Sequence, residues 1–191
     1  MSPDHPYPPL PDEAWPKQIQ DMLAGFAGGL NVYRVMAYHP ALLRAWAPLR
    51  HHVVVDNALG RELSEVTILR TGWRLQSDYE WGHHVSRARA CGLDDARIAS
   101  IRGTVEAMHP HDAVIAGAVD ELLDQAKLSD ITQGKLVALV GTAGLFDIMA
   151  TVGHYSVLAF IVNSFKTPLD PAIAAQLAVQ PLDQAPQGLS F

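Results

Sequence analysis

One short segment concentrates the side chains that could do chemistry. Residues 77–84 read Ser-Asp-Tyr-Glu-Trp-Gly-His-His. If Ser77 or Asp78 caps a helix, Glu80 and His84 are four residues apart and lie on the same helix face. A carboxylate beside an imidazole can orient the ring, fix its tautomer and raise its basicity, which is the minimum needed for proton transfer near neutral pH. The spacing therefore predicts an acid/base pair.

A third candidate group lies in the preceding segment. From Glu65 to Trp73, the positions i, i+3, i+4, i+7 and i+8 form a mostly apolar face, so Glu65 sits on or beside an apolar stripe. A carboxyl group there is either paired or has its ionisation disfavoured by desolvation. Because the link from Leu75 to Ser77 is so short, the two helices must run antiparallel or cross steeply, and Glu65 can face His84. Two carboxylates and a histidine in an apolar setting would make an acid/base centre.

The same residues also allow structural interpretations. Glu–His pairs at this spacing are common on solvated helix faces, and the helix dipole enriches glutamate in first turns. A metal site has less support, because no HExxH arrangement exists and neither Glu80 with His84 nor His109 with His111 specifies a third ligand. We therefore expect no metal. The other histidines of interest are expected to be surface or core residues: His51, His52 and His154.

The composition narrows the class of protein. The chain has 191 residues, of which 49% are apolar and 18% charged, so we expect a folded chain with a sizeable core. Lys plus Arg is 14 and Asp plus Glu is 20, a net charge of −6 that argues against nucleic-acid binding. The single cysteine, Cys91, excludes a disulfide within the chain, a two-cysteine redox motif and a cysteine-rich zinc site. No cationic-then-apolar segment opens the sequence, so we expect a cytoplasmic protein.

Helical patterns fill the chain between two proline-rich ends. We predict an extended arm over residues 1–16, a single all-α domain over 17–166 and an extended tail over 167–191. Helices are expected at 17–27, 32–38, 41–57, 61–75, 78–91, 94–101, 112–126, 131–140 and 142–165.

One apolar stretch raises the question of a membrane span. Residues 137–162 are long and apolar enough to cross a bilayer, but Asp147, His154 and three glycines interrupt them and no basic cluster flanks them. Helices that are apolar all round are buried, so we expect core or subunit-interface helices and no membrane association.

The pattern as a whole resembles the carboxymuconolactone decarboxylase/alkylhydroperoxidase-D-like (AhpD-like) family. The resemblance rests on the run from Glu65 to Arg70, on the Tyr-Glu-Trp sequence at 79–81 followed by His84, and on the Gly-Leu ending at 92–93. It covers about residues 40–123. It implies an all-α, AhpD-like helical bundle, usually without a metal or organic cofactor, that assembles as a homo-trimer or homo-hexamer.

The resemblance also separates two chemistries. The peroxidase branch carries Cys-x-x-Cys followed by His, with a Glu on the preceding helix. Matching those groups to His84 and Glu65 places the two cysteines at Ser77 and Glu80, so a dithiol peroxidase is not carried over. Cys91 lies elsewhere and is expected to be a buried packing thiol.

The branch that uses Glu and His resembles this chain better. It implies that His84 is the proton donor or base, that Glu80 orients it and that Glu65 holds or shuttles a proton. The substrate would be a small carboxylated or carbonyl-bearing metabolite undergoing decarboxylation, isomerisation or lactone chemistry. Substrate binding is also expected from Tyr79, Trp81 and His83. Arg70 is expected to bind an anionic group of the substrate.

Two other functions stay open. The chain could be a non-catalytic or binding member of the scaffold, in which case Tyr79 and Trp81 should fill the space around His84. It could instead be a peroxidase-like antioxidant protein that uses Cys91, which the missing cysteine pair disfavours.

Overall fold

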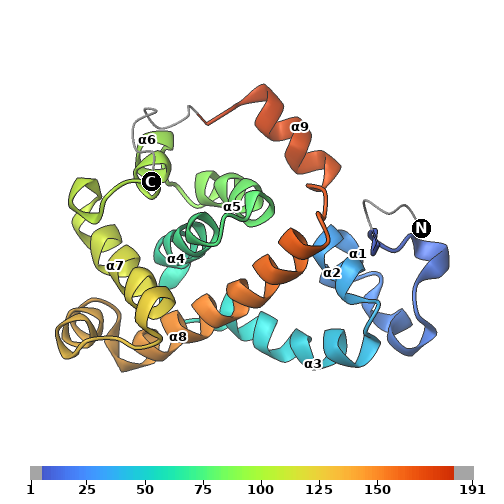
Figure 1. Cartoon of the computed structure of the whole chain (residues 1–191), viewed down its shortest axis with the longest axis horizontal. Helices are drawn as coiled ribbons and strands as arrows, with labels where there is room; N and C mark the ends of the chain where they lie inside the picture. Colours follow the sequence, from blue (N-terminus) through green and yellow to red (C-terminus); the bar gives the residue numbers. More distant parts are fainter. Residues whose placement is uncertain (1–5, 183–191) are drawn as a thin grey trace.

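Two consecutive helices, α4 (Gly60–Arg74) and α5 (Asp78–Ala90), lie at the centre of the molecule (Figure 1). The computed structural model describes residues 6–182, and within that range every regular element is helical. α4 packs against α5, against α7 (Pro110–Gln125) and against α8 (Asp130–Ser164). The predicted all-α fold class is confirmed for the described residues.

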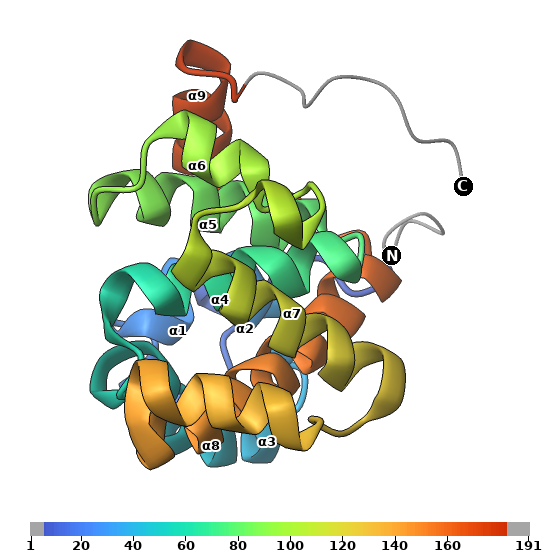
Figure 2. The same ribbon diagram turned by 90° about the vertical axis from the view of Figure 1, so that its left-hand side faces the viewer.

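The other elements form layers on either side of this pair. Figure 2 shows α5 and α6 (Asp95–Ser100) above α4, with α8 and α3 (Pro40–His51) below it. The N-terminal part adds two short helices, α1 (Phe26–Gly29) and α2 (Asn31–Met36). Single turns complete the described chain: 3-10 turns at Asp12–Ala14, Lys17–Met22 and Val105–Ala107, and a π-helical turn at His52–Asp56.

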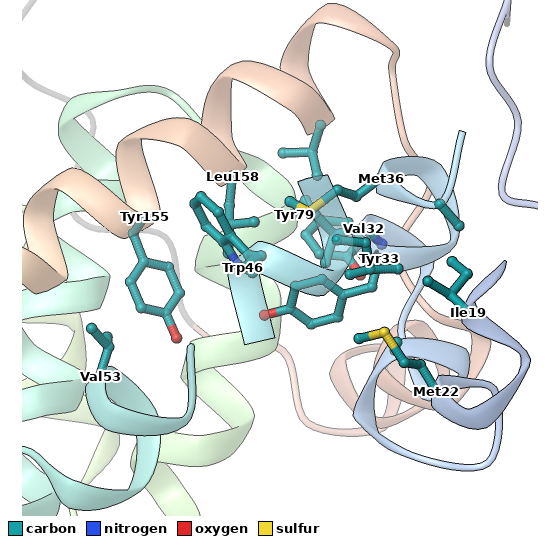
Figure 3. Close-up of a cluster of buried hydrophobic side chains, with 14 of the residues drawn as sticks. Ile19, Met22, Val32, Tyr33, Met36, Trp46, Val53, Tyr79, Tyr155 and Leu158 are labelled. Carbon is teal, nitrogen blue, oxygen red and sulfur yellow. Dashed lines mark hydrogen bonds between the residues drawn. The ribbon is translucent and has the colours of Figure 1, made fainter. Parts of the chain in front are cut away.

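Two clusters of buried side chains stabilise the arrangement. One joins the N-terminal helices and α3 to α8 and includes Tyr33, Trp46 and Tyr155 (Figure 3). The other joins α4 to α8 around residues such as Leu69 and Ile115. Because α4 and α5 contribute to both clusters, side chains on these two helices are held between them.

The predicted helix at 131–140 and the predicted helix at 142–165 form one element with a break. At Gly141 the backbone has φ +71° and ψ 177°, a conformation that a residue with a side chain rarely adopts. The start of this element follows the sequence, because Ser129 caps it by accepting a hydrogen bond from the backbone N–H of Thr132.

The C-terminal segment differs from the predicted extended tail. It contains α9 (Pro171–Val179), which packs on α5 with Leu169 and Leu177 against Gly82. Pro171 lies in the first turn of α9, where its missing N–H costs nothing, so it starts the helix. The rest of the predicted tail, residues 183–191, and residues 1–5 of the arm lie outside the described range.

By length and composition alone, one helix in the described range, α8, could cross a membrane. One of its faces contributes the buried Asp147 and His154, and another face exposes Phe146 and Phe160. α8 packs on α4 and α7, as a helix of a protein core does.

Candidate active site

The local sequence brings α5 close to α4 at the predicted acid/base residues. Ser77 caps α5 by accepting a hydrogen bond from the backbone N–H of Glu80 at 3.4 Å. Opposite, Gly72 of α4 has no side chain, and a Cβ atom there would lie 3.3 Å from that of Glu80. The glycine therefore permits the close approach that turns Glu80 into the space between the helices.

The structure brings Glu65, Glu80 and His84 together. His84 Nδ1 lies 2.6 Å from Glu65 Oε2 on α4, and His84 Nε2 lies 3.7 Å from Glu80 Oε2 on α5. Glu80 and His84 are buried, whereas 15% of the Glu65 side chain is exposed. The sequence predicted Glu80 as the group that orients the imidazole, but the short contact comes from Glu65. The reason is that the two helices pack face to face, so the cross-helix partner approaches nearer than the residue one turn away.

Burial sets the protonation states of this group. It raises the pKa of Glu80 to about 8, against a smaller opposing effect from the charge of Arg87, so Glu80 is mostly a neutral acid at pH 7. Burial also lowers the pKa of His84, although the nearby Glu65 carboxylate favours the charged ring. A carboxylate at Glu65 only accepts a hydrogen bond, so Nδ1 of the neutral ring carries the proton and Nε2 presents its lone pair toward Glu80.

A tyrosine that the sequence analysis missed borders the same site. Tyr155 of α8 contacts His84 edge-on, with ring centroids 5.0 Å apart. Burial raises its pKa well above the ordinary value, so its hydroxyl group keeps its proton. In Figure 3 the hydroxyl groups of Tyr155 and Tyr33 point toward one another. The only sequence signal was the polar pair His154-Tyr155 inside an apolar helix.

A surface hollow reaches the exposed end of this group. It has a volume of about 450 Å³, and its lining includes Glu65, Arg61, Arg87 and Cys91. Glu65 thus connects a surface recess, which carries two arginines, to the buried imidazole.

Tyr79 and His83, which were predicted to bind substrate, contact the C-terminal segment instead. The Tyr79 hydroxyl donates to Asp170 Oδ2 at 2.6 Å, and His83 Nε2 lies 2.7 Å from the same oxygen. The Tyr79 hydroxyl also accepts from the backbone N–H of Val32 at 3.1 Å. These contacts fasten α9 to α5 and α2, and the structure does not bring either side chain to the acid/base group.

Trp81 and Arg70 also have partners elsewhere. The guanidinium of Arg102 lies 4.0 Å from the centre of the Trp81 ring. Arg70 forms two hydrogen bonds to the Asp120 carboxylate, at 2.9 and 2.6 Å, and donates to the backbone oxygens of Ile101 and Gly103. With these donors occupied, the geometry gives no support to Arg70 as an anion anchor. The hydrogen bonds and ring contacts of Tyr79 and Trp81 are with residues other than His84.

Cys91 differs from the buried packing thiol that was expected. It is partly exposed, lines the hollow near Glu65 and donates a weak hydrogen bond to the backbone oxygen of Ala88 at 3.3 Å. Partial burial raises the pKa of its thiol, and the charges of Glu65 and Glu62 raise it further. Within residues 6–182, no three side chains of the metal-binding types gather closely enough to hold a metal ion.

Comparisons with known proteins agree with this fold. Residues 40–121 match the model of the carboxymuconolactone decarboxylase family. A solved structure described as an alkylhydroperoxidase AhpD core, an uncharacterized peroxidase-related protein from Ralstonia eutropha JMP134, superposes with a TM-score of 0.77 at 15% identity, covering 91% of this chain and 96% of that one. The debrominase Bmp8, solved in complex with 2,3,4-tribromopyrrole, superposes with a TM-score of 0.71 at 13% identity, covering 94% and 99%.

These identities are low, so the two structures establish the fold alone. Among curated proteins, none matches the sequence. The matched segment contains Glu65, Glu80 and His84, and the fold around it is that of the AhpD-like proteins. This chain therefore has the AhpD-like fold, and over residues 40–121 it is similar to the carboxymuconolactone decarboxylase family.

Proposed function

We propose that this protein is an acid/base enzyme whose own side chains catalyse proton transfer on a small carboxylated or carbonyl-bearing metabolite. Decarboxylation is the leading reaction, with isomerisation and lactone chemistry as close relatives of it. The substrate class follows from the family and from the chemistry that a neutral carboxylic acid beside a neutral imidazole can perform.

One observation carries the proposal. Glu80 is a buried acid with a pKa of about 8, and its Oε2 lies 3.7 Å from His84 Nε2, while Glu65 holds the other ring nitrogen. A general acid works best when its pKa is near the working pH, and this environment raises a glutamate into that range. A buried carboxyl group with so few hydrogen bonds is unfavourable to the fold. A purely structural role would therefore give no reason for Glu80 at this position.

In a decarboxylation, the substrate carboxylate leaves as carbon dioxide and its bonding electron pair stays on carbon. A water-poor site favours this loss, because it weakens solvation of the carboxylate. Glu80 then donates its proton to that carbon and becomes a carboxylate. His84 takes up a proton from solvent at Nε2, in a form that the Glu65 carboxylate stabilises, and passes this proton to Glu80. The net reaction converts one substrate carboxylate and one solvent proton into carbon dioxide and the decarboxylated product.

The test is a screen of small carboxylated lactones and keto acids for carbon dioxide release, followed by variants on any active compound. We expect Glu80→Gln to lower kcat by about 10²–10⁴-fold, the range of general acid catalysis, because the amide keeps the shape but has no acidic proton. Glu106→Gln is the control, because Glu106 is exposed and is not part of the acid/base group. This variant should keep full activity. Full turnover by both Glu80→Gln and His84→Ala would refute the assignment.

A peroxidase-like activity is the second candidate, because Cys91 lines the hollow beside Glu65 and one structural neighbour is described as peroxidase-related. The raised pKa of the thiol opposes it, since the thiolate is the nucleophile. Peroxide consumption that is lost in Cys91→Ser would favour this function over the acid/base one.

We also propose that the chain self-associates in the cytoplasm as a trimer or hexamer. Support comes from an apolar stripe on the exposed face of α8, formed by Phe146, Met149, Val157 and Phe160. Native mass spectrometry would measure the assembly, and Phe146→Glu together with Phe160→Glu should shift it toward the monomer.

A further inference from the structure

Four side chains near the acid/base group carry buried polar atoms that have no hydrogen-bond partner among the described residues. They are Trp46 Nε1, Arg50 Nε, Thr151 Oγ1 and both ring nitrogens of His154. Trp46, Thr151 and His154 are 9%, 0% and 2% exposed. An unpaired buried donor is destabilising, and most folded proteins avoid it, so several together at one place indicate a ligand site.

These atoms lie together on two helices. Trp46 and Arg50 are one turn apart on α3, and Thr151 and His154 are three residues apart on α8. The two helices meet where the rings of Trp46 and His154 pack at 4.3 Å between centroids. The unpartnered atoms therefore belong to one interior region.

The same region extends to the acid/base group. Oε1 of Glu80 is also buried without a partner, and His154 packs against Tyr155 at 5.2 Å, which in turn contacts His84 at 5.0 Å. In Figure 3, Trp46 and Tyr33 lie in the same cluster as Tyr155, and the two tyrosine hydroxyl groups point toward one another.

The chemistry of these groups favours an anion. Trp46, Arg50 and Thr151 supply N–H or O–H donors, and His154 supplies one donor and one acceptor because burial keeps it neutral, with a pKa of about 4. Arg50 forms no ion pair with an acidic side chain in the range 6–182, and its guanidinium instead lies 4.6 Å from the centre of the Phe26 ring.

Acidic groups nearby do not cancel this charge. Asp147, one turn before Thr151, is already bonded to His52 at 2.7 Å and to the backbone N–H of Ala58. Glu80 is mostly neutral at pH 7. Arg50 is thus an uncompensated cation beside a set of donors, with the aromatic rings of Tyr33, Trp46 and Tyr155 around it.

We propose that Trp46, Arg50, Thr151 and His154 form a subsite that binds the carboxylate of a small planar ring, and that the ring lies against the aromatic side chains with its reacting carbon toward Glu80. This inference rests on the proposed function for the reaction and names its substrate class, a ring-bearing monoanion. The binding itself is independent of turnover.

The experiment uses benzoate as the probe and follows the indole N–H signals of the full chain by NMR, with the Trp46 signal assigned from Trp46→Phe. We expect benzoate to shift the Trp46 signal saturably, and benzyl alcohol, which lacks the charge, to bind at least about tenfold more weakly. Arg50→Gln should weaken benzoate binding by about 10–100-fold, as expected for loss of a charged hydrogen bond. Arg44→Gln, an exposed arginine on the same helix, should leave it unchanged.

Two results would overturn the subsite. One is the absence of any saturable shift with benzoate, the outcome if water alone occupies these donors. The other is equal binding of benzoate and benzyl alcohol by the wild-type chain, a comparison that needs no variant to fold. Glu80→Gln separates the two proposals, because it should keep benzoate binding while losing turnover. Full turnover retained in both Glu80→Gln and His84→Ala would refute the proposed function and leave the subsite standing.

Discussion

Glu65 on α4 and His84 on α5 are joined by a contact of 2.6 Å between Oε2 and Nδ1. Glu80, one turn before His84 on the same helix, is 3.7 Å from the other ring nitrogen. The imidazole is therefore oriented across the helix pair by a partly exposed carboxylate and faces a buried neutral acid.

This relationship predicts that Glu65 is a positioning residue. In Glu65→Gln, the amide no longer carries the charge that stabilises a protonated His84, so we expect kcat to fall by about 10–100-fold, typical of lost support for a key side chain. The pH–rate profile should change as well, with the limb assigned to His84 moving to lower pH. Glu62→Gln, an exposed neighbour on α4, is the matched control. An unchanged profile would assign Glu65 a purely structural role.

The buried acid predicts that stability falls as the pH rises. The pKa of Glu80 is about 8 in the folded chain against 4.5 in the unfolded one, so the folded state holds the extra proton between these values. Stability is full below pH 4.5 and is lost progressively up to about pH 8, by on the order of 5 kcal/mol at about 1.4 kcal/mol per pH unit. Urea unfolding at several pH values should show this loss in the wild type and not in Glu80→Gln. A parallel loss in both proteins would contradict it.

His154 predicts the opposite trend at acid pH. Burial lowers its pKa from 6.5 to about 4, so the unfolded chain binds a proton that the folded chain refuses. Its contribution to stability is present above pH 6.5 and is lost as the pH falls toward 4, by on the order of 3 kcal/mol. Thermal unfolding of His154→Phe should be less sensitive to acid over this range than the wild type. His111→Phe, at an exposed histidine, should behave as the wild type does.

Asp170 is predicted to hold the C-terminal helix in place. Burial alone would raise its pKa, but hydrogen bonds from His83 and Tyr79 hold the pKa below its usual value. Replacing it by Asn removes the charge from this group, and we expect the free energy of unfolding to fall by about 1.5–3 kcal/mol. Limited proteolysis should also cut near α9 sooner. Asp12→Asn, which removes an exposed ion pair with Arg34, should cost less than about 1 kcal/mol.

Cys91 is predicted to be a slow nucleophile. Because its pKa is raised, the thiolate is a small fraction at pH 7, and alkylation by iodoacetamide should be slower than that of glutathione in the same buffer. Urea-unfolded protein provides the internal comparison and should react faster. Faster alkylation of the folded chain would instead indicate an activated thiol and support the peroxidase-like alternative.

Much of the helical framework could be predicted because it depends on local physics. The caps at Ser77 and Ser129 and the apolar spacing of α4 and α5 are readable in sequence, and the structure confirms them. α9 escaped prediction, since its prolines suggested an extended chain and the surface that stabilises it, around Gly82, lies about ninety residues earlier.

The sequence by itself determined which residues could share a face: Glu80 with His84 by helical spacing, and Glu65 opposite them through a short link. Only the tertiary structure decided which carboxylate bonds the imidazole, that burial raises the pKa of Glu80, and that Tyr155 and His154 border the site. The physical reason is that hydrogen-bond distance and desolvation depend on how helices far apart in the chain pack, and helical periodicity carries no information about that packing.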